Sequence, residues 1–589
     1  MHQDPAGNPL LIRPTAVCTV AELRTRLRAL LQTELFQRDV HALSKEEKLA
    51  HAYALFRKVA ETAQLRADDV VGVERMLAVL EAPVMVACIA LSPFLASHFN
   101  LCLGTIMDLG GVIRDDLRDY IDELVTMKTL GIYMVTELEH GNNAMSIETE
   151  ATYDAEAREF IINTPSDGAR KFMPYVSAPG EPKLAVVMAR LIVRGENCGV
   201  HPFIVRCRRE GGALVPGVEV SDLSTIDMHT PDPVDHSITR FINVRVPHRA
   251  FLGGRYNEVT LDGRFITTLP NRRATFMHSL KRIEWGKFVL VGALMSGVKS
   301  SVCIATRFSV NRKMVRDRAG GTSPISELTT QKTELAEAYV LVSAASSLYE
   351  VLKARCLDES CDADTHAVAA GVVKSACVEL FRVAVQKCIA RCGAQGKMVR
   401  NLMVRMLTLI DQTSTAEGDT LPVMSKLAKD MLSQRGYIPP EKEYPEALFT
   451  PEGMLAVFRS RERFIYDELR NRLAADEDTV GAWNRNLRLA VKLASALGAR
   501  LAMEALSDKP EVLMAFGLMQ MVEDGAWLAA KGLLTPQELS QALVMLEDAL
   551  LSVFATRVLK AEEEFDVADV VNLTPIGKGD LSSAWASMS

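Results

Sequence analysis

The sequence lacks the patterns that several common classes of protein need. No Cys-x-x-Cys pair occurs among its 11 cysteines, so a four-ligand zinc site is not expected and the thiols are predicted to be reduced. No run of five basic residues occurs and the formal net charge is -7, which argues against nucleic acid as a partner because phosphate binding needs clustered Lys and Arg. Aromatic residues make up only 6%, which argues against a base-stacking platform. We therefore predict no metal site and no nucleic-acid partner.

One charge-free stretch, residues 82–107, is long enough to cross a bilayer. It contains Pro93, His98 and Asn100, which would be expensive in lipid, so a buried pair of helices is predicted and no membrane span. The N-terminus shows no charged-then-apolar signal pattern, and residues 586–589 (ASMS) differ from the Ser-Lys-Leu peroxisomal address. These features predict a cytoplasmic protein.

The chain of 589 residues is too long for one hydrophobic core, so several packed units are expected. Apolar residues recur at helical spacing in about the first 130 residues, where Ser44 begins a capping box. Helical patterns return after about Thr275, and Thr535 marks a further helix start. We predict a mainly α protein with a central β-domain of barrel or sandwich type. Its four parts are a helical domain over residues 1–130, a β-domain over 131–255, a helical bundle over 256–440 and a C-terminal helical domain over 441–589.

Strand texture marks the β-domain. Residues 151–154 and 159–163 flank a short polar turn, which is typical of a hairpin. Residues 184–189, 200–205 and 242–247 indicate further strands, and Pro247 suits a strand end because proline cannot donate to the ladder.

The first motif is residues 136–141 (TELEHG), followed by 147–149 (IET) and 151–154 (ATYD). A Thr-Glu pair alone is typical of a helix cap, but this series resembles the Thr-Glu-x-Gly-His-Gly, Leu-Glu-Thr and Ala-Thr-Tyr-Asp motifs of the acyl-CoA oxidase and acyl-CoA dehydrogenase superfamily. Glu139 stands where the family has its first glycine. The resemblance implies that Thr136 contacts a flavin ring and that Gly141 belongs to the cofactor-binding loop.

The second motif is residues 305–312 (ATRFSVNR), on a predicted helix. It resembles the family's Arg-Tyr-Ser-x-x-Arg, which implies that Arg312 binds a flavin pyrophosphate, a task that suits the planar guanidinium fork. A helix arginine taken alone is more often a solvated surface residue. Gln331 falls where the family has a glutamine near the cofactor.

The third motif carries the catalytic prediction. Residues 392–396 (CGAQG) resemble the family's Cys-Gly-Gly-His-Gly, and residues 416–420 (AEGDT) resemble Phe-Glu-Gly-Glu-Asn. The step of 25 residues from Cys392 to Glu417 equals the family's separation. The resemblance implies that Glu417 is the catalytic base, and that Gly393 and Gly396 contact the cofactor.

The resemblance to the oxidase branch implies a mainly helical flavoprotein that uses FAD. It would remove two hydrogens from an acyl-CoA, or from an acyl group on a carrier protein, to give the 2-enoyl thioester. Reoxidation by O2 would give H2O2, as in fatty acid β-oxidation. A homodimer is implied, in which Arg312 and the loop at residues 393–396 serve the other chain's cofactor. The alternatives are a dehydrogenase with another electron acceptor, a flavin monooxygenase on the same fold and a flavin-free binding scaffold.

Several positions depart from the family pattern. Residues 171–175 (KFMPY) stand where the family has Lys-Trp-Trp-Pro-Gly. Tyr175 thus replaces a glycine that touches the flavin in the family, and the tyrosine could either clash with the flavin ring or stack on it. Residues 228–235 are divergent, and Ala394, Gln395 and Ala416 replace Gly, His and an aromatic residue. We expect an altered substrate pocket and weaker FAD binding. The acyl chain and its carrier stay open.

Overall fold

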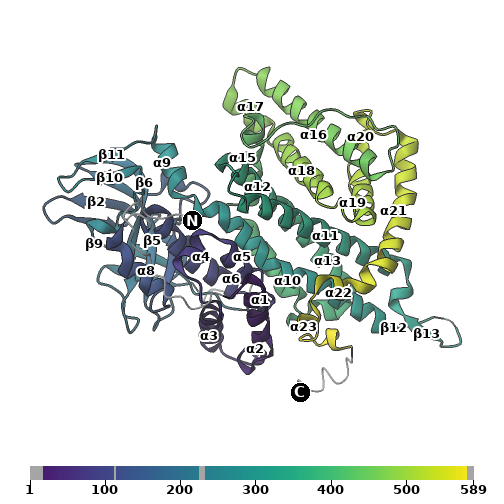
Figure 1. The fold of residues 1–589 in the computed structure, drawn as a ribbon, viewed down its shortest axis with the longest axis horizontal. Coiled ribbons are helices and arrows are strands. Elements are labelled where there is room, and N and C mark those ends of the chain that lie inside the picture. Colours follow the sequence, from purple (N-terminus) through teal and green to yellow (C-terminus); the bar gives the residue numbers. More distant parts are fainter. Residues whose placement is uncertain (1–17, 41, 112–113, 224–231, 317, 580–589) are drawn as a thin grey trace.

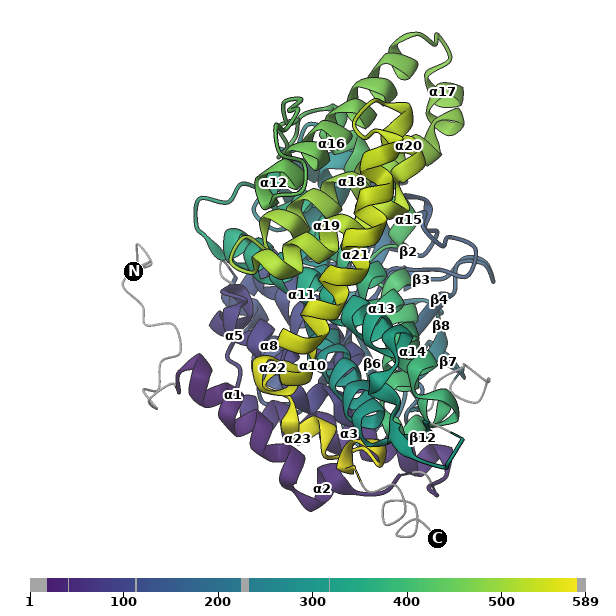
Figure 2. The same ribbon diagram turned by 90° about the vertical axis from the view of Figure 1, so that its right-hand side faces the viewer.

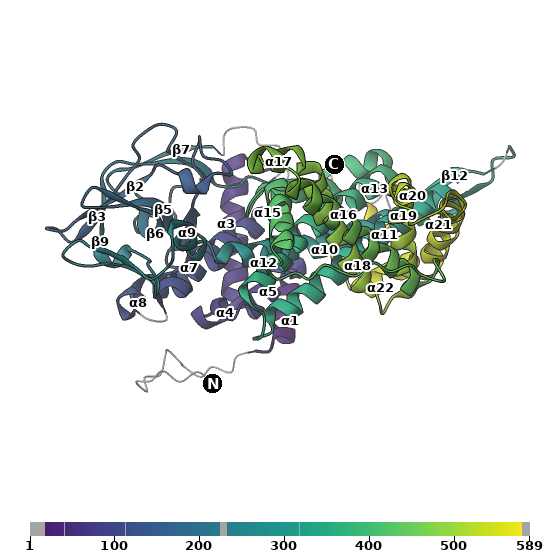
Figure 3. The same ribbon diagram turned by 90° about the horizontal axis from the view of Figure 1, so that it is seen from above.

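The computed structural model describes residues 18–40, 42–111, 114–223, 232–316 and 318–579. A β-domain forms one end of the elongated molecule, and the C-terminal helices form the other (Figures 1 and 3). The long helix α10 (Arg282–Asn311) runs between them, with the N-terminal helices packed beside it. The predicted fold class, mainly α with a central β-domain, is confirmed.

Short amphipathic helices make up the N-terminal region. The predicted capping box is confirmed: the Ser44 hydroxyl accepts from Glu47 N, and the Glu47 carboxylate accepts from Ser44 N. Helix α3 then buries Phe56 and Val59. The helices of this region are α1 (Val20–Ala29), α2 (Glu34–Gln37), α3 (Lys45–Ala63), α4 (Ala67–Val71), α5 (Glu74–Leu80), α6 (Leu91–Leu95), α7 (Gly104–Ile106) and α8 (Arg118–Val125).

The charge-free stretch at residues 82–107 is buried, as predicted. It is not a pair of helices: a 3-10 turn, Pro83–Ala87, precedes one continuous helix made of α6, a π-helix at Ala96–Leu103 and α7. This helix packs against the first strand of the β-domain. Two other segments, Arg272–Asn311 and Thr329–Leu357, are long and apolar enough to cross a membrane, but 94% and 78% of their most apolar windows are buried inside the protein.

The β-domain holds a six-stranded sheet in the order β1-β5-β2-β3-β9, with β6 paired to β5. Strands β2 and β3 form the predicted antiparallel hairpin, and Pro247 ends β9. A three-stranded sheet, β4-β8-β7, lies beside it, and β10 and β11 form a hairpin beyond residue 255. The strands are β1 (Leu130–Met134), β2 (Glu150–Asp154), β3 (Glu159–Asn163), β4 (Lys171–Tyr175), β5 (Lys183–Val193), β6 (Glu196–Arg208), β7 (Val218–Asp222), β8 (His236–Phe241), β9 (Val244–Pro247), β10 (Asn257–Val259) and β11 (Phe265–Thr267).

Helix α10 forms the centre of the following bundle, where it packs against α11, α13 and α14. A small hairpin of β12 (Lys313–Val315) and β13 (Thr322–Pro324) follows it and protrudes from the end of the molecule (Figure 3). The bundle's other helices are α11 (Thr329–Leu357), α12 (Ala363–Val372), α13 (Val378–Arg391), α14 (Met403–Thr415) and α15 (Thr420–Leu432). Helix α9 (Arg272–Ser279), which precedes α10, packs on β6 of the β-domain (Figure 1).

The C-terminal helices cover the bundle on the side away from the β-domain. The longest of them after α16, α21, crosses α11 and α19 (Figure 2). It begins at the predicted capping box of Thr535 and Glu538. These helices are α16 (Pro451–Ala474), α17 (Thr479–Arg485), α18 (Leu487–Glu504), α19 (Pro510–Glu523), α20 (Gly525–Ala530), α21 (Pro536–Thr556), α22 (Ala561–Phe565) and α23 (Ala568–Val571).

Candidate active site

Glu417 lies in the short loop between α14 and α15, with its carboxylate packed against α10. Both Glu417 and Gly418 have a positive φ, 54° and 93°, a conformation that glycine adopts freely and that is uncommon for glutamate. On α10, a Cβ added to Gly286 would lie 2.6–2.9 Å from the carboxyl atoms of Glu417. The helix therefore needs a glycine at 286 to make room for this carboxylate.

The surroundings of Glu417 favour its neutral form. Burial raises the pKa of this carboxyl from 4.5 to about 7, while the positive charges of Lys374 and Lys287 oppose the rise and that of Glu284 adds to it. A carboxylate with a pKa near neutrality can both hold and release a proton at physiological pH. Glu417 thus has the properties that a general base needs.

Two tyrosines from the β-domain lie within electrostatic reach of Glu417. Burial raises the pKa of Tyr133, on β1, and of Tyr175, on β4, and the negative charge of Glu417 adds to both shifts. The buried hydroxyl of Tyr133 finds no hydrogen-bond partner among the residues that the structure describes. The base therefore lies near the β-domain, where the Tyr133 hydroxyl is an unsatisfied polar group.

Thr136 lies just beyond the end of β1, three residues after Tyr133. Its carbonyl accepts a hydrogen bond from Phe172 N at 2.9 Å. Their chain neighbours Glu137 and Lys171 form an antiparallel β-bridge and are buried. Because side chains alternate along extended backbone, Thr136 and Phe172 present theirs to the opposite face from that buried pair. Thr136 is exposed there, and could contact a ligand.

Glu137 supports this edge from behind. Its Oε1 accepts from Thr149 N at 2.9 Å, Thr149 Oγ1 at 2.6 Å and Lys171 Nζ at 3.0 Å, and its Oε2 accepts from Glu148 N at 2.7 Å. These contacts join the TELEHG, IET and KFMPY segments into one unit. The supporting roles of Glu137 and Lys171 were not predicted from the sequence, although both residues stand inside the motifs at 136–141 and 171–175.

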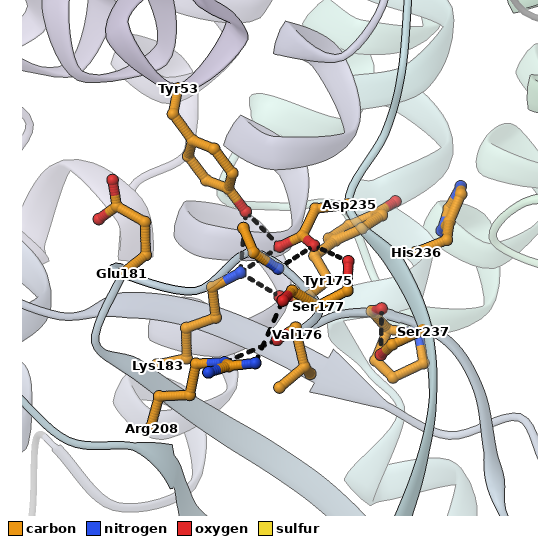
Figure 4. Close-up of polar contacts among 12 residues, drawn as sticks. Tyr53, Tyr175, Val176, Ser177, Glu181, Lys183, Arg208, Asp235, His236 and Ser237 are labelled. Atoms are coloured by element: carbon orange, nitrogen blue, oxygen red, sulfur yellow. Dashed lines mark hydrogen bonds and ion pairs between the residues drawn. The ribbon is translucent and has the colours of Figure 1, made fainter. Parts of the chain in front are cut away.

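Tyr175 is held by aromatic neighbours and by a buried ionic network. Its ring lies 5.5 Å from Phe94 and 5.2 Å from His236, centre to centre. Its carbonyl accepts from Lys183 Nζ at 2.9 Å, and Lys183 also pairs with Asp235, which accepts from the Tyr53 hydroxyl at 2.6 Å (Figure 4). Tyr53 belongs to α3, so the network ties the Tyr175 strand to the N-terminal helices. Of the divergent segment at 228–235, residues 228–231 lie outside the described part of the chain.

The other predicted cofactor residues lie at the far end of α10. Arg312 is the first residue after that helix, not a residue within it as predicted, and it is exposed. Gln331 donates to Ser309 Oγ at 2.7 Å and to the Arg391 carbonyl at 3.0 Å, so it joins α10, α11 and α13. Nearby, Gly393 has a φ of 56° with open space around it.

Gly396 and Gly141 differ in their surroundings. A Cβ on Gly396 would lie 2.2 Å from the Ile389 carbonyl, so packing alone demands a glycine there, whereas Gly141 sits in an exposed loop with nothing within 4 Å of a built Cβ. Arg312 is 26 residues along from Gly286, about 39 Å at 1.5 Å per helical residue. Apart from Gly141, the predicted site residues of one chain therefore form two groups. The first contains Thr136, Tyr175 and Glu417, and the second contains Arg312, Gln331, Gly393 and Gly396.

Comparison with known proteins points to one family. Residues 284–432, which include Gly286, Lys374 and Glu417, match the family model of the acyl-CoA oxidase C-alpha1 domain. The chain is 28% identical over 468 residues to peroxisomal acyl-coenzyme A oxidase 2 of Arabidopsis thaliana, with 72% of this chain and 66% of that protein covered. The chain is similar to acyl-CoA oxidases. Human peroxisomal acyl-coenzyme A oxidase 3 is 28% identical to this chain, with 62% of this chain and 54% of that protein covered. The matched region therefore spans about half to two thirds of the length of these two relatives.

Solved acyl-CoA oxidases share the fold over nearly the whole chain. Acyl-CoA oxidase 3 of Yarrowia lipolytica superimposes with a TM-score of 0.82 at 17% identity, over 96% of this chain and 88% of its own. Acyl-CoA oxidase 2 of Caenorhabditis elegans, solved with FAD, ascaroside-CoA and ATP, gives a TM-score of 0.78 at 18% identity, over 95% and 88%. At these identities the likeness establishes the fold.

Proposed function

We propose that this protein is an FAD-dependent acyl-CoA oxidase in which Glu417 is the catalytic base. One observation carries the proposal: a carboxylate whose pKa is raised to about 7 lies within electrostatic reach of Tyr133 and Tyr175 of the β-domain. The unpartnered Tyr133 hydroxyl and the exposed Thr136 side chain fit a polar ring system such as a flavin. FAD, when bound, would supply the hydride acceptor that no side chain can provide.

The chain's own residues would prepare the substrate. An acyl thioester would lie with its second carbon against the Glu417 carboxylate, which removes the α-proton. The backbone N–H of Glu417, on a loop of fixed positive φ, is the candidate donor to the thioester oxygen, where one donor is typically worth about 3–4 kcal/mol. Thr136 would orient the flavin ring, and the Glu137–Lys171 pair would keep Thr136 in place.

The second group of residues supports a homodimer. Arg312 lies about 39 Å along α10 from Gly286, which contacts the base. Gln331 bonds to Ser309 near this far end of α10 and to Arg391, just before the loop at residues 393–396, so this group is too far away to complete the same site within one chain. In a symmetric pair they could bind the pyrophosphate of the neighbour's FAD. Gln331 would then act by holding the Arg391 and Ser309 ends of the helices.

The products proposed are the 2-enoyl thioester and H2O2. Acyl-coenzyme A is the substrate class that the relatives' names give, and oxidases pass electrons to O2. A dehydrogenase using another acceptor is the main alternative within the same site. Several relatives are called peroxisomal, whereas the cytoplasmic location of this chain stays a prediction of its sequence.

Oxygen consumption tests this function. Purified protein is expected to be yellow and, on addition of an acyl-CoA, to consume O2 and form H2O2 in equal amounts. Flavin reduction without O2 uptake, with turnover only in the presence of an artificial electron acceptor, would indicate the dehydrogenase. A colourless protein that takes up no FAD would contradict the proposal.

The pH dependence of turnover follows from the raised pKa of Glu417. Only the ionised carboxylate accepts a proton, so activity is absent well below the pKa and appears as the pH rises through about 7. For a single titration, kcat/KM should be about tenfold lower at pH 6 than at pH 8. A profile that is flat between these values, or one with its midpoint near 4.5, would rule out a desolvated Glu417 as the base.

A further inference from the structure

Lys374 is a fully buried lysine directly beneath the Glu417 loop. Its ammonium group donates to two carbonyls, those of Ala416 and Gly418, which flank Glu417 on either side. Buried lysines are rare unless their charge is matched by a partner. The two carbonyls and the negative charge of the Glu417 carboxylate stabilise the buried ammonium group of Lys374.

A local irregularity of the helix brings Lys374 to this position. Helices α12 and α13 form one continuous helix interrupted by a π-helix at Val373–Cys377. A π-turn inserts an extra residue and rotates the following side chains about the axis, and such turns frequently occur at functional sites. Here the inserted turn contains Lys374 itself, so the distortion and the contact with the base loop coincide.

The Glu417 loop has a conformation that needs support. Glu417 and Gly418 are consecutive residues with a positive φ, and for a non-glycine residue such a backbone costs about 1–3 kcal/mol unless the surroundings enforce it. Lys374 binds the carbonyl before this pair and the carbonyl at its end. One side chain thus fixes both ends of the strained segment.

Charged groups from every neighbouring element act on this pair. Burial lowers the pKa of Lys374 to about 8, while the charges of Glu417 and Asp419 raise it and that of Lys287 lowers it. Tyr133 and Tyr175 face Glu417 from the β-domain, and Lys287 and Glu284 face it from α10. The positive charge of Lys374 lowers the pKa of Glu417 more than that of Lys287 does, so the removal of Lys374 should have the larger effect.

We propose that Lys374 is a positioning residue for the reaction, which holds the base loop through its two carbonyls and supplies positive charge that favours the ionised form of Glu417. This inference rests on the proposed function of Glu417. It assigns to Lys374 no contact with substrate. Its effect reaches the reaction only through the geometry and the ionisation of the base.

The test compares the pH profiles of Lys374→Met, Lys374→Arg and the unchanged protein, each loaded with FAD. Because an opposite charge nearby shifts a pKa by about 1–3 units, the midpoint of kcat/KM should move up by at least about one pH unit in Lys374→Met. Turnover at pH 7 should fall about tenfold and recover in part at higher pH. Lys374→Arg keeps the charge, so its midpoint should stay near that of the unchanged protein.

Lys353→Met is the matched control. Lys353 is also buried and pairs with Glu81 at 2.6 Å, away from the base loop. Its loss should lower the melting temperature by a similar amount and leave the midpoint of kcat/KM unchanged. If Lys374→Met does not fold, Lys374→Gln, which is also uncharged, replaces it. An unchanged midpoint with turnover within twofold would overturn the inference. A Glu417→Gln variant with full activity would instead overturn the proposed function.

Discussion

Glu417→Gln should abolish turnover and leave a folded yellow protein. The amide has nearly the shape of the carboxylate but cannot accept the α-proton, and general-base catalysis of this kind contributes about 10²–10⁴-fold. We expect kcat to fall by about three orders of magnitude at pH 8. Steady-state oxygen uptake with an acyl-CoA is the measurement.

The folded state of this variant provides the control. Burial disfavours the charged carboxylate, as its raised pKa indicates, so replacement by a neutral amide should not lower the melting temperature at pH 8. FAD content should also stay unchanged. If the variant loses FAD or its fold together with activity, the loss of activity does not support Glu417 as the base. Retained activity would contradict that role directly.

Gly286→Ala should have the second largest effect. The added Cβ would lie 2.6–2.9 Å from the carboxyl atoms of Glu417, and the flexible end of that side chain must move away because the helix backbone cannot. A displacement of about 1 Å in a reacting group can cost about 10²-fold in rate. We therefore expect kcat to fall about a hundredfold, measured under the same conditions.

Gly371→Ala separates this effect from a general response to alanine. Gly371 also lies inside a helix, α12, but the nearest atoms to its built Cβ, on Leu427 and Val423, are 3.8 Å away. Alanine favours a helix over glycine by about 1 kcal/mol, so this variant should be fully active and no less stable. Equal activity of Gly286→Ala and Gly371→Ala would show that the position of the Glu417 carboxylate does not depend on the glycine at 286.

Local sequence patterns were sufficient for much of the fold. The capping boxes at Ser44 and Thr535 satisfy backbone donors through residues three positions apart, so they can be identified without tertiary structure. The β2–β3 hairpin is equally local. The position of Glu417 came from motif spacing, and the structure adds the physical reason: a positive-φ loop next to a helix glycine.

Long-range contacts explain what the sequence could not indicate. Lys374 and Glu417 are 43 residues apart, and the apolar run around Lys374 gives no sign of a π-turn because helical periodicity predicts a regular helix. Gly286 precedes the base by 131 residues. The end of α10 just before Arg312 was missed since helix boundaries shift by a residue or two with local capping.

Anaerobic mixing with an acyl-CoA tests the central claim most directly, because it isolates proton removal and flavin reduction from the reaction with oxygen. The visible absorbance of bound flavin should bleach within one turnover in the unchanged protein, at a rate that rises with pH through about 7. The Glu417→Gln variant should bind the same ligand and keep its colour. Bleaching of that variant at the unchanged protein's rate would contradict the account.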